Sequence, residues 1–277
     1  MIFTTAEFNR HTGIGNKLFP WARAKIFASS FDAKMLAQNW ISIRGAAVTR
    51  GGIDYSKMLG KIFLFNNFIN DNKEINRIFW NLKYKKFCDS NTVSNLEEAF
   101  SFSKMDNKLI IFRWNTDHFF SDFELHRKLI IDSLYRITRP NILRRTFCDH
   151  PFIGINIRLG NDFIEQNSKE NGYKKTSLEW YLDNISNVRD IHGNLPIYIV
   201  SDGSPKQLEV FKKFKDVTIK NNNRAIEDLL FLSHAQALMG SGNSSFSAWA
   251  SFLGDMPTYS SKDTPFNCFK LKNTQIL

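Results

Sequence analysis

The sequence has few cysteines and no long apolar segment. Cys88, Cys148 and Cys268 are odd in number and far apart, and no Cys-x-x-Cys pair occurs, so the sequence indicates neither a disulfide framework nor a zinc site. An apolar run of about 18 residues, the length of a membrane-spanning helix, is missing. The first residues also lack the basic-then-apolar pattern of a signal peptide. We therefore expect a cytoplasmic chain without a membrane span.

Several motifs of catalysis and nucleotide binding are missing as well. The six histidines form no His-Glu-x-x-His spacing, and no serine stands in a Gly-x-Ser-x-Gly turn. No Asp-x-Asp pair is present to hold a metal at a strand end. The segment Gly13-Ile-Gly-Asn-Lys17 is shorter than a P-loop and has no third glycine to complete a dinucleotide fingerprint. The sequence therefore supports neither zinc-dependent nor Ser-His-Asp hydrolysis.

The composition is that of a folded, basic protein. Among 277 residues, 43% are hydrophobic and 23% are charged, which is ordinary for a packed globular chain, and the length allows two modest α/β domains. The formal net charge of +10 favours nucleic acid, an anionic membrane surface or a phosphorylated ligand as a partner. Because no helix-turn-helix, zinc-finger or aromatic RNA-binding pattern accompanies this charge, we expect no nucleic-acid partner.

Short apolar runs alternate with helical patterns through the second half of the chain. This alternation predicts a parallel, doubly wound sheet, and such sheets bind ligands at the carboxyl ends of their strands. At that edge we expect Arg158, Asp202 and the turn Gly240–Ser245 to lie together. The predicted strands are 152–158, 196–201, 217–219 and 235–239, and the predicted helices are 177–189, 206–215, 227–234 and 244–253.

The first half opens with a strand–turn–helix pattern, the basic element of a nucleotide-binding sheet. The strand is predicted over 2–5, the glycine-bearing turn over 11–17 and the helix over 18–28, with further helices over 74–87 and 122–137. The helix over 74–87 has lysines beside an apolar stripe, a pattern typical of a core-facing surface helix, with contact to an anionic bilayer as the alternative.

Two prolines and clustered charge over 139–151 indicate the crossing between two domains. We therefore divide the chain into a domain 1–145 and a domain 146–277, and the last residues of the second are free to pack back on the first.

The turn Gly240-Ser-Gly-Asn-Ser-Ser245 is the strongest local feature. A predicted strand ends there and a helix begins near Ser244, so exposed backbone N–H groups and hydroxyls form an anion site. The alternative is a plain serine N-cap. Arg158 stands at a strand end where a core position would be apolar, and a guanidinium can grip a diphosphate bidentately. A structural ion pair is the alternative for Arg158.

Six segments resemble, in order, those of the α-1,2-fucosyltransferases of glycosyltransferase family 11. The family patterns are Gly-x-Gly-Asn-Gln-Leu-Phe, Gly-Tyr-Trp-Gln-Ser-x-x-Tyr-Phe, His-x-Arg-Arg-Gly-Asp, Phe-Ser-Asp, Asp-Leu-x-Leu-Met-Ser and Asn-Ser-Thr-Phe-Ser-Trp-Trp. Each match is weak alone, but the ordered set covers most of the chain. The matching segments here are Gly13–Phe19, Phe112–Phe120, Asn156–Asn161, Ile199–Asp202, Glu227–Ser233 and Gly242–Trp249.

This resemblance implies a GT-B-like α/β fold, in which two Rossmann-like domains face a cleft and the C-terminal one binds the donor. It implies that Arg158 holds the β-phosphate, that Asp228 accepts from guanine N1–H and N2–H, and that the helix start at Ser244 binds the diphosphate. The first domain's glycine segment would approach the donor across the cleft. The full donor-binding set implied is Gly13, Gly15, Asn16, Asn156, Arg158, Asp202, Asp228, Ser244 and Ser245.

Three positions depart from the family pattern. Asn156 replaces the motif histidine, Leu159 the second arginine and Asn161 the acidic residue, with Asp162 displaced by one position. These departures bear on fucose specificity and on acceptor binding. For a proton-accepting carboxylate, Asp162 and Glu165 are the nearest candidates after the Arg158 strand, with solvated loop charges as the alternative.

The leading hypothesis is an inverting fucosyltransferase that uses GDP-fucose and no metal or other cofactor. Arg158 and the helix start at Ser244 would stabilise the leaving diphosphate. We expect a carbohydrate acceptor of the surface-glycan type, lipid-linked in one version of the hypothesis, with α-1,2 linkage and peripheral contact with an anionic membrane. A related enzyme with another nucleotide-sugar donor is the second hypothesis, and a non-catalytic nucleotide- or glycan-binding relative is the third.

Overall fold

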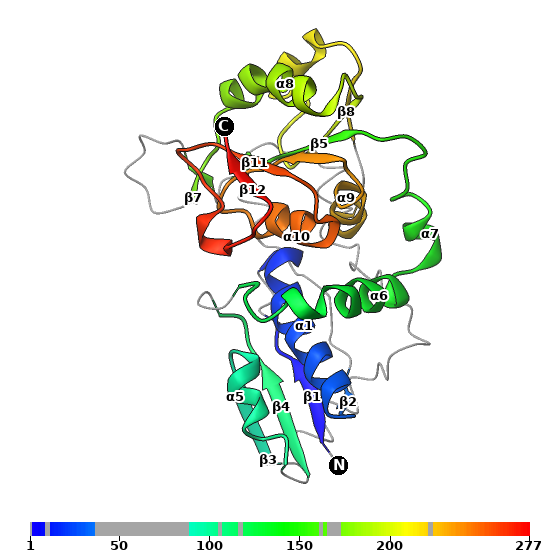
Figure 1. Cartoon of the computed structure of the whole chain (residues 1–277), viewed down its shortest axis with the longest axis vertical. Coiled ribbons are helices and arrows are strands. Elements are labelled where there is room, and N and C mark those ends of the chain that lie inside the picture. The colour runs from blue at the N-terminus through cyan, green and yellow to red at the C-terminus, as the bar shows by residue number, and fades with distance from the viewer. Residues whose placement is uncertain are drawn as a thin grey trace. The chain divides into compact units, whose positions relative to one another are not determined.

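The computed structural model describes residues 2–8, 12–36, 89–104, 107–115, 119–160, 163–164, 173–220 and 224–277. The predicted helix over 74–87 and the thiol of Cys88 lie outside these residues. The described residues divide into two compact units at the Leu143–Arg144 bond, and each is built on a parallel sheet (Figure 1). No helix among the described residues is long and apolar enough to cross a membrane.

The first unit is a four-stranded parallel sheet with helices packed on it. Its strand order is β2-β1-β4-β3. The central strand β1 is buried along its whole length, as expected for a parallel strand covered on both faces. The strands are β1 (Phe3–Ala6), β2 (Lys34–Met35), β3 (Asp89–Val93) and β4 (Lys108–Phe112), and the helices are α1 (Ile14–Ser30), α5 (Leu96–Phe100), α6 (Arg127–Ile137) and α7 (Pro140–Leu143).

Helix α1 begins earlier than the sequence predicts. Gly13 has an extended backbone (φ −69°, ψ 168°) and is the N-cap, so the helix starts at Ile14 rather than at Leu18. Ile14 and Leu18 are four residues apart and both buried, which places them on one core-facing stripe from the first turn. The predicted glycine turn is therefore wrong for its second half, because Gly15 belongs to the first helical turn.

A buried ion pair fixes α1 to the segment before α6. The Arg23 side chain is fully buried, and its Nε lies 3.0 Å from Asp122 Oδ2. Its NH2 group donates to the Phe119 carbonyl at 3.2 Å. The helix predicted over 122–137 begins instead with a 3₁₀ turn (Glu124–His126), followed by α6 from Arg127.

The second unit is the predicted parallel, doubly wound sheet. Its strand order is β12-β11-β10-β5-β8-β9. The strands are β5 (Ile153–Ile157), β8 (Ile197–Ser201), β9 (Val217–Ile219), β10 (Ala237–Met239), β11 (Thr258–Ser260) and β12 (Thr274–Ile276), with β6 (Phe163–Ile164) and β7 (Tyr173–Lys174) paired separately. The helices are α8 (Leu178–His192), α9 (Ala225–Leu232) and α10 (Ser245–Gly254), with 3₁₀ turns at Glu209–Lys213 and Asn267–Phe269.

Alternate side chains of β5 and β8 enter two separate cores. Ile153, Ile155 and Ile157 pack with α8 on one face of the sheet. Val200 packs with α9 and α10 residues on the other face. Gly154 is needed on that second face, because a Cβ there would lie 2.9 Å from Leu232 Cδ2 of α9. The near-continuous apolar character of these strands therefore reflects burial on both faces.

One helix of the second unit is of a different type from the prediction. The pattern over 206–215 predicts an α-helix, whereas the structure has turns and then the short 3₁₀ segment Glu209–Lys213. Only Leu208 and Phe211 of this stretch are buried. Two apolar anchors three residues apart match the 3₁₀ repeat and give too little burial to stabilise a longer helix.

Candidate functional site

The strand order places a topological switch point between β5 and β10. From β5 the chain proceeds outward to β8 and β9, and it then returns to β10 on the opposite side of β5 before continuing to β11 and β12. In open α/β sheets, ligands bind outside the carboxyl ends of the two strands where the winding direction reverses. Arg158 directly follows β5, and Gly240 directly follows β10. The two sequence features singled out for phosphate binding therefore flank the switch point.

A buried hydroxyl joins these two strand ends. The Arg158 backbone N–H donates to Ser241 Oγ at 2.9 Å, and the Ser241 N–H donates to the Asn156 carbonyl at 3.1 Å. The Tyr181 hydroxyl of α8 lies 2.9 Å from Ser241 Oγ and donates to the same carbonyl at 3.1 Å. Burial raises the pKa of the Tyr181 hydroxyl well above its usual range, so it remains a proton donor.

The Arg158 guanidinium forms an ion pair with Asp202. Arg158 NH1 lies 2.7 Å from Asp202 Oδ2, and each side chain is less than one-fifth exposed. Asp202 directly follows β8 and also accepts from the Leu159 N–H at 2.8 Å. The structure therefore brings Arg158 and Asp202 together as predicted, and Asp202 holds the arginine in position at the sheet edge.

Close backbone packing shapes the turn after β10. A Cβ on Gly242 would lie 1.5 Å from the Thr264 carbonyl oxygen, and one on Gly240 would lie 2.6 Å from the Phe266 ring. Only glycine leaves room for these approaches. The Gly242 N–H donates to Thr176 Oγ1 at 3.3 Å, so the turn is fixed from two sides.

Helix α10 begins at this turn with a serine cap. The Ser244 side chain is buried, and its Oγ accepts from the Ser247 N–H at 3.4 Å, so the N-cap interpretation of Ser244 is confirmed. Ser245 is the first helical residue and is half-buried. The N–H groups of this first turn give the positive end of the helix dipole, which favours an anion.

Asn156 has a structural position. Its Oδ1 accepts from Ser247 Oγ at 2.6 Å, and its Nδ2 donates to the Val200 carbonyl at 3.3 Å. The residue is buried and joins β5 to β8 and α10. Asn156 was predicted to bind the donor. In the structure its side chain instead makes hydrogen bonds within the second unit, to Ser247 and Val200.

The first turn of α9 carries two adjacent carboxylates. Asp228, the predicted guanine reader, is half-buried, whereas Glu227 is buried. Glu227 Oε2 lies 3.8 Å from Arg145 NH1 and has no hydrogen-bond partner among the described residues. A carboxylate oxygen in this position is costly to bury. Glu227 is not among the predicted site residues, although the Glu-Asp pair at a helix start is a signal for it.

The glycine segment of the first unit forms the start of α1. Gly13 caps the helix without a side-chain hydrogen bond, and the first turn contains no acidic residue. Gly15 and Asn16 lie in that turn, and Lys17 beside them is buried. Basic charge and a helix start that has neither a side-chain cap nor an acidic residue are suited to an anion. Asp162 and Glu165, the candidate bases, lie outside the described residues.

The fold resembles those of solved fucosyltransferases. NodZ α-1,6-fucosyltransferase co-crystallised with GDP matches at a TM-score of 0.53 and 14% identity over 95% of each chain. POFUT1 in complex with GDP-fucose matches at 0.51 and 12%, over 94% of this chain and 97% of that one. A mutant of Arabidopsis thaliana FUT1 in complex with GDP matches at 0.50 and 14%, over 95% of this chain and 72% of that one.

These similarities establish the fold class. A shared fold does not determine function, which depends on the residues of the site. The prediction of an α/β, GT-B-like fold is confirmed. No protein-family model matches the chain, and no curated protein sequence matches it.

Proposed function

We propose that this protein is a glycosyltransferase that moves fucose from GDP-fucose to a carbohydrate acceptor. The observation that carries the proposal is the switch point, where Arg158 and the start of α10 follow neighbouring strands and are joined through Ser241. This is the edge at which a doubly wound sheet binds a nucleotide. The similarity in fold to fucosyltransferases solved with GDP or GDP-fucose supports this choice of donor.

The charges at this edge suit a departing diphosphate. A guanidinium has five N–H donors in a rigid fork, so its pairing with Asp202 is compatible with contact to a phosphate. The α10 N-terminus adds partial positive charge that requires no reorganisation during transfer. We propose that these two groups stabilise the negative charge that develops on GDP as the sugar–oxygen bond breaks.

The finer features of the reaction remain part of the proposal. We propose a single displacement with inversion, no metal or other cofactor, and an α-1,2 linkage as in the family that the sequence resembles. Asp228 would accept from guanine N1–H and N2–H, and Asp162 or Glu165 would take the proton from the acceptor hydroxyl. The segment of Gly13, Gly15 and Asn16 would bind the donor from the first unit.

Two observations support the alternatives. The Asn156 side chain is buried and accepts from Ser247. This position is a histidine in the resembled family, and here it has no side chain available to a ligand. Asp202 already neutralises part of the Arg158 charge. Both are compatible with a different nucleotide-sugar donor or with a binding protein that does not catalyse transfer.

A thermal-shift panel of GDP, UDP, ADP and CMP tests the proposal. We expect GDP alone to raise the melting temperature of the wild type and of Arg136→Ala, a control in which an exposed arginine of α6 is removed. Arg158→Ala should lose the response. At a concentration 100-fold above Kd the stabilisation is about 2.7 kcal/mol, which is large enough to resolve.

Mass analysis of glycans incubated with GDP-fucose then tests transfer itself. A GDP response that persists in Arg158→Ala would contradict the proposed site, and a response to UDP alone would favour the second donor hypothesis. GDP binding without any product across the glycan panel would favour the non-catalytic relative.

We further propose a cytoplasmic location, with peripheral contact between the basic protein and an anionic membrane that carries a lipid-linked acceptor.

A further inference from the structure

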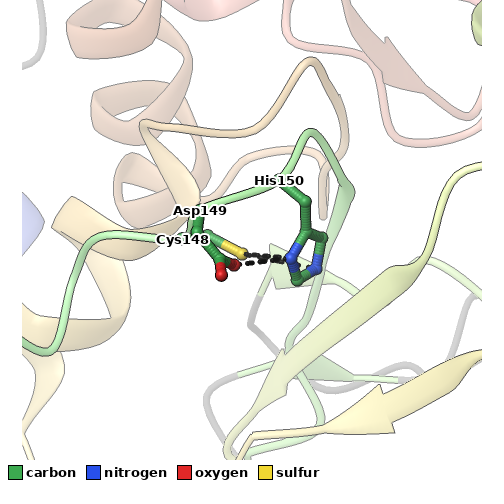
Figure 2. A group of neighbouring side chains, drawn as sticks. All are labelled: Cys148, Asp149 and His150. Carbon is green, nitrogen blue, oxygen red and sulfur yellow. Dashed lines mark hydrogen bonds and ion pairs between the residues drawn. The ribbon is translucent and has the colours of Figure 1, made fainter.

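Three consecutive side chains before β5 form a cluster of metal-ligating groups. Cys148, Asp149 and His150 each offer one ligand atom, and these atoms all lie within 4.8 Å of one another. Figure 2 shows the thiol and the carboxylate both directed toward the imidazole ring. Cys148 Sγ lies 3.7 Å from His150 Nδ1 and 3.5 Å from His150 Nε2, and Asp149 Oδ1 lies 2.7 Å from Nδ1.

We propose that this cluster binds one divalent ion of the zinc class through Cys148 Sγ, Asp149 Oδ1 and His150 Nδ1. Zinc bonds of about 2.3 Å to sulfur and about 2.0–2.1 Å to nitrogen give a tetrahedral sulfur–nitrogen edge of roughly 3.6 Å. The observed 3.7 Å separation matches this edge. The carboxylate–imidazole separation must widen from 2.7 Å to roughly 3.3 Å, which rotation of the almost fully exposed Asp149 side chain allows.

Tyr198 of β8 contacts the histidine of the cluster. Its hydroxyl lies 3.1 Å from His150 Nε2, so the ring can donate from Nε2–H to this oxygen and direct Nδ1 toward the metal. Metal-binding histidines usually have such an outer partner, which fixes the tautomer and the ring orientation. Cys148 packs against the core formed by Phe152 and Val200, which holds the soft thiolate ligand in place.

The site lies at the end of the sheet opposite the switch point. His150 precedes β5 and Arg158 follows it, and the five residues of the strand alone span roughly 16 Å. The proposed ion would therefore not contact the donor. It would fix the segment that enters the second unit after Arg144, and its presence is independent of the proposed transferase activity.

Cobalt titration of the chelator-treated full chain tests the site, because Co²⁺ gives visible bands in tetrahedral sites and a near-ultraviolet charge-transfer band with thiolate. We expect one equivalent to bind with both signals. Cys148→Ser should lose the charge-transfer band, whereas Cys268→Ser, in which another described free thiol is removed, should keep it. His150→Gln should bind at least tenfold more weakly.

Tyr198→Phe separates the proposed coordination from accidental binding to exposed groups. It removes no ligand and leaves the thiol, carboxylate and ring in place, yet we expect a loss of affinity of about tenfold because the ring orientation is lost. A charge-transfer band that persists in Cys148→Ser, or the absence of any band in the wild type, would overturn the proposal. Equal affinity in Tyr198→Phe would overturn the chosen geometry.

Discussion

Replacing Ser241 by alanine is the sharpest test of how the sheet edge holds Arg158. The Ser241 hydroxyl accepts from the Arg158 N–H, donates to the Asn156 carbonyl and lies within hydrogen-bond distance of the Tyr181 hydroxyl. In the variant the Asn156 carbonyl still accepts from the Tyr181 hydroxyl and from the backbone N–H at position 241. The Arg158 N–H loses the acceptor that holds it in the wild type.

The expected loss in the free energy of unfolding follows from the hydrogen bonds that each variant loses. A donor left unsatisfied in a part-buried position costs about 1–3 kcal/mol, so we expect Ser241→Ala to lower the free energy of unfolding by about 2 kcal/mol. Tyr181→Phe removes a hydroxyl whose partners keep other bonds, and it should cost about 1 kcal/mol. Because the two hydroxyls contact each other, the double variant should be less destabilised than the sum, by about 0.5–1 kcal/mol.

Urea unfolding followed by tryptophan fluorescence measures these values, with GDP affinity as a second reading. Ser233→Ala is the matched control, because the hydroxyl of this α9 C-cap residue donates, among the described residues, to the Leu230 carbonyl alone. This variant should cost less than about 1 kcal/mol. GDP affinity should fall in Ser241→Ala and remain unchanged in the control. A cost for Ser241→Ala no larger than that of Ser233→Ala, or strict additivity with Tyr181→Phe, would refute the reasoning.

Two further substitutions test the buried ion pair of the first unit and the close backbone packing of the second. Asp122→Asn should lower the free energy of unfolding of the first unit by about 3–5 kcal/mol, because it leaves the buried Arg23 charge uncompensated. Urea unfolding measures this change, and a loss below about 1 kcal/mol would contradict the prediction. Gly242→Ala should lower the melting temperature, with a cost of at least about 1–3 kcal/mol, since its Cβ would collide with the Thr264 carbonyl; an unchanged melting temperature in calorimetry would show that the turn is looser than described.

The sequence predicted those features of the second unit that depend on local patterns. The apolar runs of β5 and β8 are evident because both faces of the sheet are buried. Two predicted helices begin at Ser177 and Ser244, and in the structure both serines are N-caps whose side chains accept from N–H groups three residues on. Arg158 was identified because a charged residue directly after an apolar strand is unusual for a core position.

Long-range features could not be predicted in this way. The switch point depends on the order of strands in space, which no local pattern determines. The cluster of Cys148 and His150 contains a single cysteine, so no Cys-x-x-Cys spacing marks it in the sequence, and the contact between His150 and Tyr198 joins residues 48 positions apart. Burial of Glu227 depends on how α9 packs on the sheet, which the local sequence does not determine.

Helix α8 packs on one face of the sheet and is remote in sequence from the proposed phosphate contacts, yet its Tyr181 reaches the junction at Ser241. We therefore expect substitutions along α8 to change the affinity for the proposed donor without contact between α8 and the donor. A screen for altered donor preference should include the buried positions of this helix together with the residues at the strand ends. Conversely, ligand-induced protection from hydrogen exchange should extend from the strand ends into α8.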